Sequence, residues 1–306
     1  MTPTMTPADR NVEQAVGGLD VRTEGLAVNH GSVQAVVDAD IEWGAGRIHG
    51  LLGRNGAGKT TLLSAVASLL PPNSGRVVVD GSDPFEDERL MGQVCLVRES
   101  GNVVGDENLR WNIGMQELAR PSFDSDWALE LLDRFHLKPK SKPDKLSRGQ
   151  RSAFNAVIGL ASRAPVTMFD EVHIGMDAPT RQFFTDLLIE DIAERPRTIV
   201  LSSHLINEIE HLLETVTILH KGRVILNAEA DDVRSRGVTI TGPAARVDEV
   251  CRELTVVGTR DLGPTRQVTA YGDLPDDALQ AAERSGLTIG AAPLQELFIH
   301  LTEETP

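Results

Sequence analysis

The stretch GRNGAGKTT, residues 53–61, contains residue types that bind phosphate, at the spacing that phosphate binding requires. It fits the phosphate-loop pattern of Gly, four residues, Gly, Lys and then Ser or Thr. Lys59 would reach the outer phosphates, and the Thr60 hydroxyl would bind Mg²⁺. A glycine-rich turn without a ligand is the alternative, but every fixed position of the pattern is present. The residues predicted to bind nucleotide are Gly53, Arg54, Asn55, Gly56, Ala57, Gly58, Lys59, Thr60 and Thr61.

The neighbours of this loop also fit a phosphate site. An apolar strand predicted at residues 48–52 runs into the loop, and a helix is predicted to leave it. We expect that helix to run as far as Pro71 and Pro72, because proline cannot continue a helix.

A pair of carboxylates ends a second apolar segment, PVTMFDE. The strand predicted at residues 166–169 is followed by Asp170 and Glu171, which places one carboxylate beside the phosphate loop and the next toward the reacting water. Asp170 would hold Mg²⁺ through water, and Glu171 would polarise the attacking water. An acidic pair that merely ends a buried strand in solvent is the alternative for an isolated match, and the phosphate loop weakens it.

A second anion-attracting element is KLSRGQRSAFN, residues 145–155, where a Ser and Gly turn opens onto a helix. The free N–H groups and the positive dipole end of a helix start attract anions. Taken alone, Ser147 would be an ordinary helix cap. The position of this element relative to the phosphate loop and the acidic strand suggests more than a cap.

The motif LSRGQ, residues 146–150, lies shortly before the acidic strand and resembles the signature sequence of ABC ATPases. The resemblance covers roughly residues 20–230 and implies a phosphate-loop NTPase fold of the ABC ATPase type, with a RecA-like core and a helical subdomain. In that family two nucleotide-binding domains pair head to tail around ATP. By this resemblance, Ser147, Gly149 and Gln150 of one copy would cap the γ-phosphate of the ATP held by the other.

Three further site residues are implied by the same resemblance. In SSHLINEIE, His204 follows an apolar strand, as does the family's switch histidine that contacts the γ-phosphate, so we expect a catalytic role for it. In GMD, residues 175–177, Asp177 resembles the residue that contacts the opposite subunit. His30 stands where the family usually has an aromatic side chain stacked on adenine, and an imidazole ring offers less area for stacking.

The chain also departs from the family pattern at three positions. Glu99 stands in the position of a Gln that approaches Mg²⁺, so we treat it as a candidate metal ligand with an added negative charge. Arg148 replaces the second Gly of the signature, and Val172 replaces the Pro after the catalytic Glu. None of these changes removes a reacting group, so a homodimer with two working sites is sufficient.

The elements that must position these residues are predicted from alternating patterns. Short apolar runs (RIHGLLG, GRVVVD, GQVCLV, APVTMFDE, RTIVLSSH) alternate with helix-like segments (TLLSAVASLL, WALELLDRFHL, PTRQFFTDLLIEDIAE). Such alternation predicts an α/β fold with a mostly parallel sheet.

The chain of 306 residues suggests about two domains. We expect a disordered tail at residues 1–18, a nucleotide-binding domain at 19–236 and a small C-terminal α+β domain at 237–306. The last part has strand candidates (GVTIT, RQVTAYG, GLTIGA) and helix candidates (ARVDEVCREL, PDDALQAAERSG). Its closing segment PLQELFIHLTEE resembles the final helix of ATPase subunits in drug- and antibiotic-exporter-type ABC transporters, and as an amphipathic helix it would pack on its own domain.

Composition limits the partners and the compartment. The net charge of −15 argues against nucleic acid, whose binding is driven by Lys and Arg. No run approaches the roughly 18 apolar residues of a membrane helix, and no secretory signal begins the chain. Cys95 and Cys251 are expected to be reduced thiols. We therefore expect a cytoplasmic protein, attached to the inner face of the cell membrane through a permease.

Together these features predict an ATP-hydrolysing, Mg²⁺-dependent subunit that dimerises around two ATP molecules and drives a separate integral membrane permease. A soluble ABC ATPase that acts as a mechanical clamp on ribosomes or DNA is the alternative. Such proteins usually have two cassettes or a long coiled coil and a basic surface, which this chain lacks. A phosphate-loop kinase would need an acceptor site in place of LSRGQ. The transported substrate and its direction belong to the permease.

Overall fold

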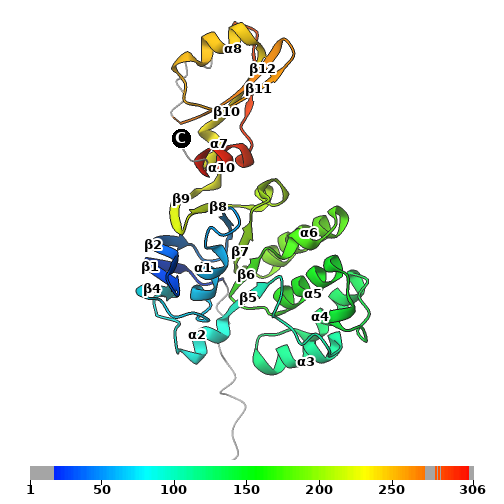
Figure 1. The fold of residues 1–306 in the computed structure, drawn as a ribbon. Coiled ribbons are helices and arrows are strands. Elements are labelled where there is room, and N and C mark those ends of the chain that lie inside the picture. Colours follow the sequence, from blue (N-terminus) through cyan, green and yellow to red (C-terminus); the bar gives the residue numbers. More distant parts are fainter. Residues whose placement is uncertain (1–16, 273–279, 281, 283, 303–306) are drawn as a thin grey trace, which may run out of the picture.

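The computed structural model describes residues 17–272, 280, 282 and 284–302 and arranges them around three sheets (Figure 1). The largest sheet has the strand order β5-β6-β7-β3-β8-β9. Its first five strands are parallel, and β9 is antiparallel to β8. This confirms the predicted α/β fold with a mostly parallel sheet. The strands are β3 (Ile48–Leu52), β5 (Val94–Arg98), β6 (Val166–Asp170), β7 (Thr198–Ser203), β8 (Thr215–His220) and β9 (Arg223–Glu229).

The second sheet is antiparallel and has the order β2-β1-β4. It consists of β1 (Val21–His30), β2 (Val33–Trp43) and β4 (Ser74–Val79). The segment GRVVVD, which the sequence pattern assigned to the parallel alternation, is β4 and pairs antiparallel with β1. That assignment was wrong because a short apolar run does not say which strand it will pair with. Helix α1 (Lys59–Val66) shares one buried core with both sheets.

Helix α1 ends earlier than the prolines at residues 71 and 72 predicted. Ser68 adopts a left-handed conformation with φ 57°. The Leu69 N–H bonds the Ser64 carbonyl at 2.8 Å, and the Ser68 N–H bonds the Ala65 carbonyl at 3.0 Å. These two bonds form a Schellman motif, which satisfies the last carbonyls of the helix before the prolines are reached.

Four helices on the other side of the large sheet form the predicted helical region, and each begins at a polar cap. The cap residues Asn108, Asp124, Ser147 and Asp177 accept a hydrogen bond from a backbone N–H in the first turn. The helices are α3 (Leu109–Ala119), α4 (Ser125–Arg134), α5 (Arg148–Ala161) and α6 (Ala178–Glu194), with the shorter α2 (Glu88–Gln93) before β5. Their apolar faces form the larger buried core with the sheet.

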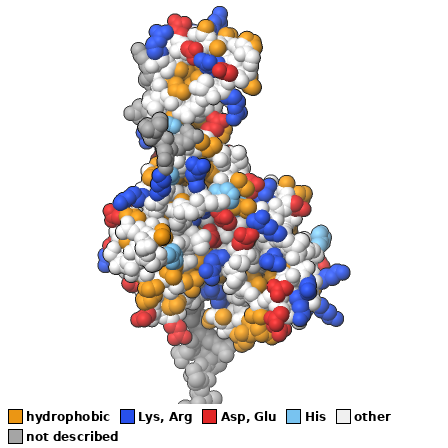
Figure 2. All heavy atoms as spheres, viewed as in Figure 1, with side chains coloured by type: hydrophobic (Ala, Val, Ile, Leu, Met, Phe, Trp, Pro, Cys, Tyr) orange, Lys and Arg blue, Asp and Glu red, His pale blue; other side chains and the backbone are white. Residues whose placement is uncertain are grey.

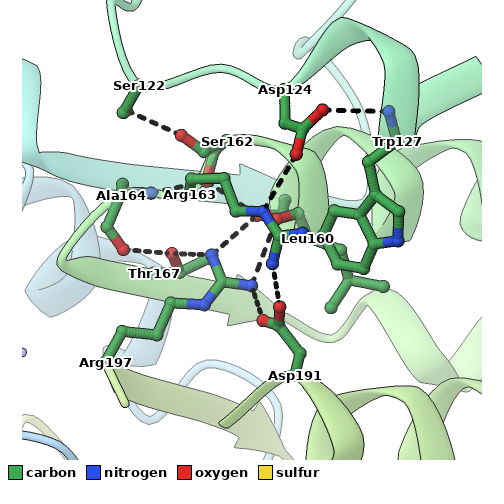
Figure 3. Close-up of polar contacts among 11 residues, drawn as sticks. Ser122, Asp124, Trp127, Leu160, Ser162, Arg163, Ala164, Thr167, Asp191 and Arg197 are labelled. Atoms are coloured by element: carbon green, nitrogen blue, oxygen red, sulfur yellow. Dashed lines mark hydrogen bonds and ion pairs between the residues drawn. The ribbon is translucent and has the colours of Figure 1, made fainter. Parts of the chain in front are cut away.

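A buried cluster of charges joins this helical region to the sheet (Figure 3). The Asp191 carboxylate near the end of α6 accepts hydrogen bonds from both Arg163 and Arg197. Arg197 is only 4% exposed, and it also donates to the Thr167 hydroxyl at 3.3 Å and to the Leu160 carbonyl at 3.1 Å. Burial lowers the pKa of both guanidinium groups, and the negative charge of Asp191 opposes that shift.

Arg163 extends the cluster to α4. Its guanidinium lies 3.6 Å from the ring centroid of Trp127, a cation–π contact. It also forms an ion pair at 3.5 Å with Asp124, the residue that caps α4. The cluster therefore fastens α4, α6 and the starts of β6 and β7 to one another.

The third sheet lies in the C-terminal part and has the order β11-β12-β10-β13. The strands are β10 (Gly237–Pro243), β11 (Val256–Leu262), β12 (Thr265–Tyr271) and β13 (Thr288–Ala291), with helices α7 (Ala230–Ser235), α8 (Ala244–Val250) and α10 (Leu294–Thr302). Three strands match the predicted ones, but the sequence pattern missed β11. Most of the predicted helix at PDDALQAAERSG, and the predicted tail up to residue 16, lie outside the described residues.

Helix α10 packs differently from the prediction. Leu294, Leu297 and Phe298 belong to the larger core of the nucleotide-binding part, together with Ile206 and Ile209, and not only to their own sheet. Figure 1 shows α10 at the junction between the upper sheet and the lower body. The C-terminal sheet has a separate small core. Both cysteines are free and buried, and no described helix is long and apolar enough to span a membrane.

Candidate nucleotide-binding site

The phosphate loop connects the end of β3 to the start of α1 and is shaped by two left-handed glycines. Gly56 has φ 80° and Gly58 has φ 107°, which are backbone conformations that glycine adopts without strain. A Cβ at Gly58 would lie 2.2 Å from the Ala35 carbonyl oxygen, so no larger residue fits. The Lys59 side chain is buried, and its Nζ donates to the Gly53 carbonyl at 2.7 Å. The loop is thus curled around its own lysine.

A hollow of about 420 Å³ lies over this loop. The predicted residues Asn55 to Thr61 and Glu171 line it. Sequence reasoning missed the rest of the lining, which comes from the start of β2 and from the turn between β8 and β9: Val33, Gln34, Ala35, Lys221 and Gly222. These segments carry no motif. They lie here because the Gly222 N–H donates to the Ala57 carbonyl at 2.9 Å and the Ala35 carbonyl packs against Gly58.

His30 lies beside the loop at the end of β1. Its Nε2 is 3.1 Å from the Thr61 hydroxyl, so the residue predicted to stack on adenine is held against the first turn of α1. Val33, the first residue of β2, is 64% exposed. Together the two side chains offer a partly apolar surface at the mouth of the hollow.

Asp170 ends β6 and joins the phosphate loop to the neighbouring strand β7. One carboxylate oxygen accepts from the Thr60 hydroxyl at 2.6 Å, and the other accepts from the Ser202 hydroxyl at 2.7 Å. Hydroxyl and carboxylate oxygens are the ligands that Mg²⁺ prefers. Thr60 and Asp170 therefore fit the chemistry of a magnesium ion.

Glu171 lies at the centre of the predicted catalytic group. Its Oε1 is 3.1 Å from Lys59 Nζ and 2.9 Å from His204 Nδ1. Burial by itself would raise the pKa of Glu171, but the hydrogen bond from His204 and the charge of Lys59 outweigh burial and lower it, so the carboxyl is ionised. Its backbone has φ 56°, an uncommon conformation for a residue other than glycine that is often found at functional sites.

The signature motif forms an exposed helix start. The Ser147 hydroxyl accepts from the Gln150 N–H at 3.2 Å, and the Gln150 side chain accepts from the Ser147 N–H at 3.0 Å. This reciprocal pair is a capping box, so the simple interpretation of Ser147 as a helix cap is correct as far as the single chain goes. A Cβ at Gly149 would lie 3.2 Å from the Gly175 carbonyl, which shows that the GMD loop packs beside the signature.

Asp177 follows this loop and caps α6, accepting from the Thr180 N–H at 3.0 Å. Hydrogen bonding from the side chain and then from the backbone of Thr180 lowers the pKa of Asp177. Ser147 is not among the residues that line the hollow, and Figure 1 shows α5 well apart from α1. The chain therefore has two separate groups of predicted site residues, one around Lys59 and one around Ser147.

Two departures from the family pattern contact each other. The Arg148 guanidinium forms an ion pair with Glu99 at 3.0 Å, and both side chains are more than half exposed. Glu99 thus contacts the signature helix, whereas Asp170 contacts Thr60 and Ser202. Magnesium binding by Glu99, as predicted, would require this ion pair to open.

Comparisons with known proteins place this site in a family. The family model "ABC transporter" matches residues 36–173. The ABC transporter ATP-binding protein NatA of Bacillus subtilis (strain 168) is 31% identical over 202 residues, which are 63% of this chain and 81% of that protein. The daunorubicin resistance ATP-binding protein DrrA3 of Streptomyces coeruleorubidus is 28% identical over 314 residues, covering 92% of this chain and 95% of that protein.

Solved structures agree on the fold. An ATP-binding subunit of an ABC transporter superposes with a TM-score of 0.64 at 23% identity, covering 70% of this chain and 92% of that one. An ATP-binding cassette solved as a dimer in a post-hydrolysis state with ADP and Pi gives 0.60 at 20% identity, covering 69% and 98%. The chain belongs to the family of ABC transporter ATP-binding proteins. Within that family it is an ATP-binding and ATP-hydrolysing subunit, which acts with a separate permease.

Proposed function

We propose that two copies of this chain close around two Mg-ATP molecules and that each ATP is hydrolysed in a composite site. The residues of the phosphate loop, with His30, would hold the nucleotide of their own copy. Ser147, Gly149, Gln150 and Asp177 would meet the nucleotide or the loop of the other copy. The separation of the two groups within one chain supports this arrangement, because the exposed start of α5 lies away from the phosphate loop of its own chain and is left to attract an anion held elsewhere.

The juxtaposition of Lys59, Glu171 and His204 is the observation that carries the hydrolytic part of the proposal. A phosphate in the loop would compete for the Lys59 ammonium. Glu171 would then be left with His204 as its partner and with a lone pair for a water molecule. As an ionised carboxylate, Glu171 would accept a proton from that water as it attacks the γ-phosphate, and His204 would hold the carboxylate and contact the phosphate.

Thr60 and Asp170 would hold Mg²⁺, whose charge, when bound, stabilises the negative charge that develops on the phosphates. Asp170 is positioned for this by its two hydroxyl partners, Thr60 and Ser202. Both hydroxyls can rotate, so either carboxylate oxygen can be turned toward an ion without movement of the strand.

We further propose that the partner permease belongs to an exporter of the drug or antibiotic type. The similarity to DrrA3 spans 92% of this chain. Residues 1–236 make up a smaller share of the chain than that, so the similarity extends into the C-terminal part. Residues 19–236 would form the nucleotide-binding domain and residues 237–306 an accessory domain. The protein would be cytoplasmic and attached to the inner face of the cell membrane through the permease.

The surface that meets the permease would be the exposed apolar face of α3. Trp111, Met115 and Leu118 are 40%, 43% and 81% exposed, and their spacing puts them on one side of the helix. Beside them lies a hollow of about 390 Å³ between α2 and α3, lined by Met91, Gln116 and Arg120 among others. Hydrophobic side chains gather over α3 at the lower edge of the face in Figure 2. An apolar patch of this kind is typical of a protein contact.

Substitution of Leu118 by Asp should therefore weaken the permease complex at least about tenfold, since burial of a leucine contributes about 1.5–3 kcal/mol. The ATPase activity of the isolated subunit should stay unchanged. Co-purification with the permease measures the effect. Ile189→Asp on α6, where Ile189 is 50% exposed, is the matched control and should leave the complex intact. Equal loss of the permease complex in both variants, or an intact complex in both, would contradict the proposed surface.

The nucleotide site is tested with Lys59→Ala. Because this change removes the buried ammonium from the loop, ATP should bind about tenfold to hundredfold more weakly, as expected for the loss of a charge-assisted contact. Titration with ATP measures binding, and a melting curve checks that the fold survives. Lys140→Ala, at an exposed lysine, should behave as the wild type. Wild-type affinity in the Lys59 variant would overturn the assignment of the loop.

A further inference from the structure

The segment that carries His204 is held by polar contacts on one side. His204 follows β7 directly and precedes a 3-10 turn at Ile206–Glu208. The Ser203 hydroxyl accepts from the Leu205 N–H at 2.9 Å, and His173 Nε2 lies 3.0 Å from the same hydroxyl. Burial lowers the pKa of His173 to about 4, so this support is neutral at physiological pH. These contacts fix the residues immediately before and after His204.

The other side of the segment is held from the C-terminal part of the chain. The 3-10 turn has no cap from its own neighbouring side chains. Instead, the Ile206 N–H donates to Gln295 Oε1 of α10 at 3.1 Å, across 89 residues of sequence. Ile206 is fully buried, so its N–H depends on this acceptor. Gln295 thus acts as the helix cap that the turn lacks.

Helix α10 is itself fixed on both sides. Its Leu294, Leu297 and Phe298 lie in the same core as Ile206. The next residue after Gln295, Glu296, accepts from the Thr269 hydroxyl of β12 at 2.5 Å, which anchors the helix to the C-terminal sheet. Two adjacent polar side chains of α10 therefore point to different partners: Gln295 to the His204 segment and Glu296 to its own sheet.

The turn also reaches the loop around Asp177. Glu208, at its end, forms an ion pair with Arg181 of α6 at 2.9 Å. A displacement of Ile206 would therefore move His204 on one side and the start of α6 on the other. Through Gln295, the C-terminal part accepts a hydrogen bond from this segment.

We propose that Gln295 is a positioning residue for ATP hydrolysis: by capping the turn at Ile206 it holds His204 in contact with Glu171. The C-terminal part would in this way set the rate of hydrolysis without touching the nucleotide. The proposal rests on the function proposed above, in which His204 and Glu171 act in hydrolysis. Gln295 is not among the residues that line the hollow over the phosphate loop, so we expect it to contribute nothing to ATP binding.

Replacement of Gln295 by Leu in the full chain tests this. Leu keeps the bulk of the side chain but removes the acceptor. Loss of one net hydrogen bond corresponds to a change of about threefold to tenfold, so kcat for ATP should fall by about that factor. KM should stay as in the wild type. Gln295→Glu, which retains an acceptor oxygen, should restore most of the rate. Glu296→Gln, a change at the neighbouring position that keeps an acceptor oxygen for Thr269, should leave kcat unchanged.

A double-variant cycle separates positioning from general loss of stability. In a His204→Ala background, Gln295→Leu should have no further effect on kcat, because the residue through which it acts is gone. Independent, multiplicative effects of the two changes would overturn the proposal, as would wild-type kcat in Gln295→Leu. If instead His204→Ala alone hydrolyses ATP at the wild-type rate, the role of His204 fails, and with it the function proposed for this cluster. The two failures are therefore distinguishable.

Discussion

Replacing Glu171 with Gln is expected to slow ATP hydrolysis about a thousandfold, within the range of about 10²–10⁴ that a general base contributes. Gln has the same size and still accepts a hydrogen bond, so the contacts with Lys59 and His204 keep their geometry. It lacks the negative charge and basicity needed to take a proton from water. ATP should therefore bind and persist, and single-turnover assays with radiolabelled ATP measure the loss.

The same variant should reveal the dimer. If Ser147 of one copy caps the ATP held by the other, Glu171→Gln should accumulate as a dimer with ATP and Mg²⁺ but not with ADP, and size-exclusion chromatography distinguishes these states. Addition of Ser147→Arg should abolish the dimer, because a long side chain blocks the cap while the phosphate loop is untouched. Persistent ATP-dependent association in the double variant would show that α5 does not face the nucleotide of the other copy.

The largest effect on stability is expected at Asp191. Asp191→Ala would leave Arg163 and Arg197 buried without their shared carboxylate (Figure 3). Removal of one partner from a buried ion pair costs about 3–5 kcal/mol. For a chain of this size that corresponds to a fall in melting temperature of about 10 °C. Thermal unfolding followed by circular dichroism measures it.

Glu194→Ala is the matched control, since Glu194 is an exposed acidic residue at the end of the same helix. It should change stability by less than about 0.5 kcal/mol, as is usual for surface substitutions. A melting temperature for Asp191→Ala close to that of the control would mean that the two arginines find other partners or lose their charge.

The motifs predicted the elements that carry the chemistry better than those that surround it. The strand at residues 48–52 and the one that ends at Asp170 were predicted within a residue, because a phosphate loop and a catalytic carboxylate require a strand directly before them. The assignment of β4 to the parallel sheet and the end of α1 were wrong. Pairing partners and a Schellman motif at Ser68 depend on contacts that a single run of residues does not encode.

The proximity of predicted residues could be anticipated only where the fold dictates it. Asp170 and Thr60 meet because parallel strands end at one edge of a sheet. No rule of this kind predicts the ion pair between Glu99 and Arg148. Each residue was interpreted separately, as a departure from the family pattern. The lining by Val33 to Ala35 and the contact of Gln295 with Ile206 likewise carry no motif. They follow from how separate segments pack.

The position of α10 has a consequence for how the protein is made. Ile206 precedes Gln295 by 89 residues in the chain. During translation, the nucleotide-binding part therefore emerges from the ribosome while one wall of its core is still missing. Until Leu294, Leu297 and Phe298 have been translated, the apolar side chains around Ile206 remain open to solvent and to chaperones. The cassette of this protein therefore completes its folding only after its C-terminal neighbour has been synthesised, although domains generally fold in the order of translation.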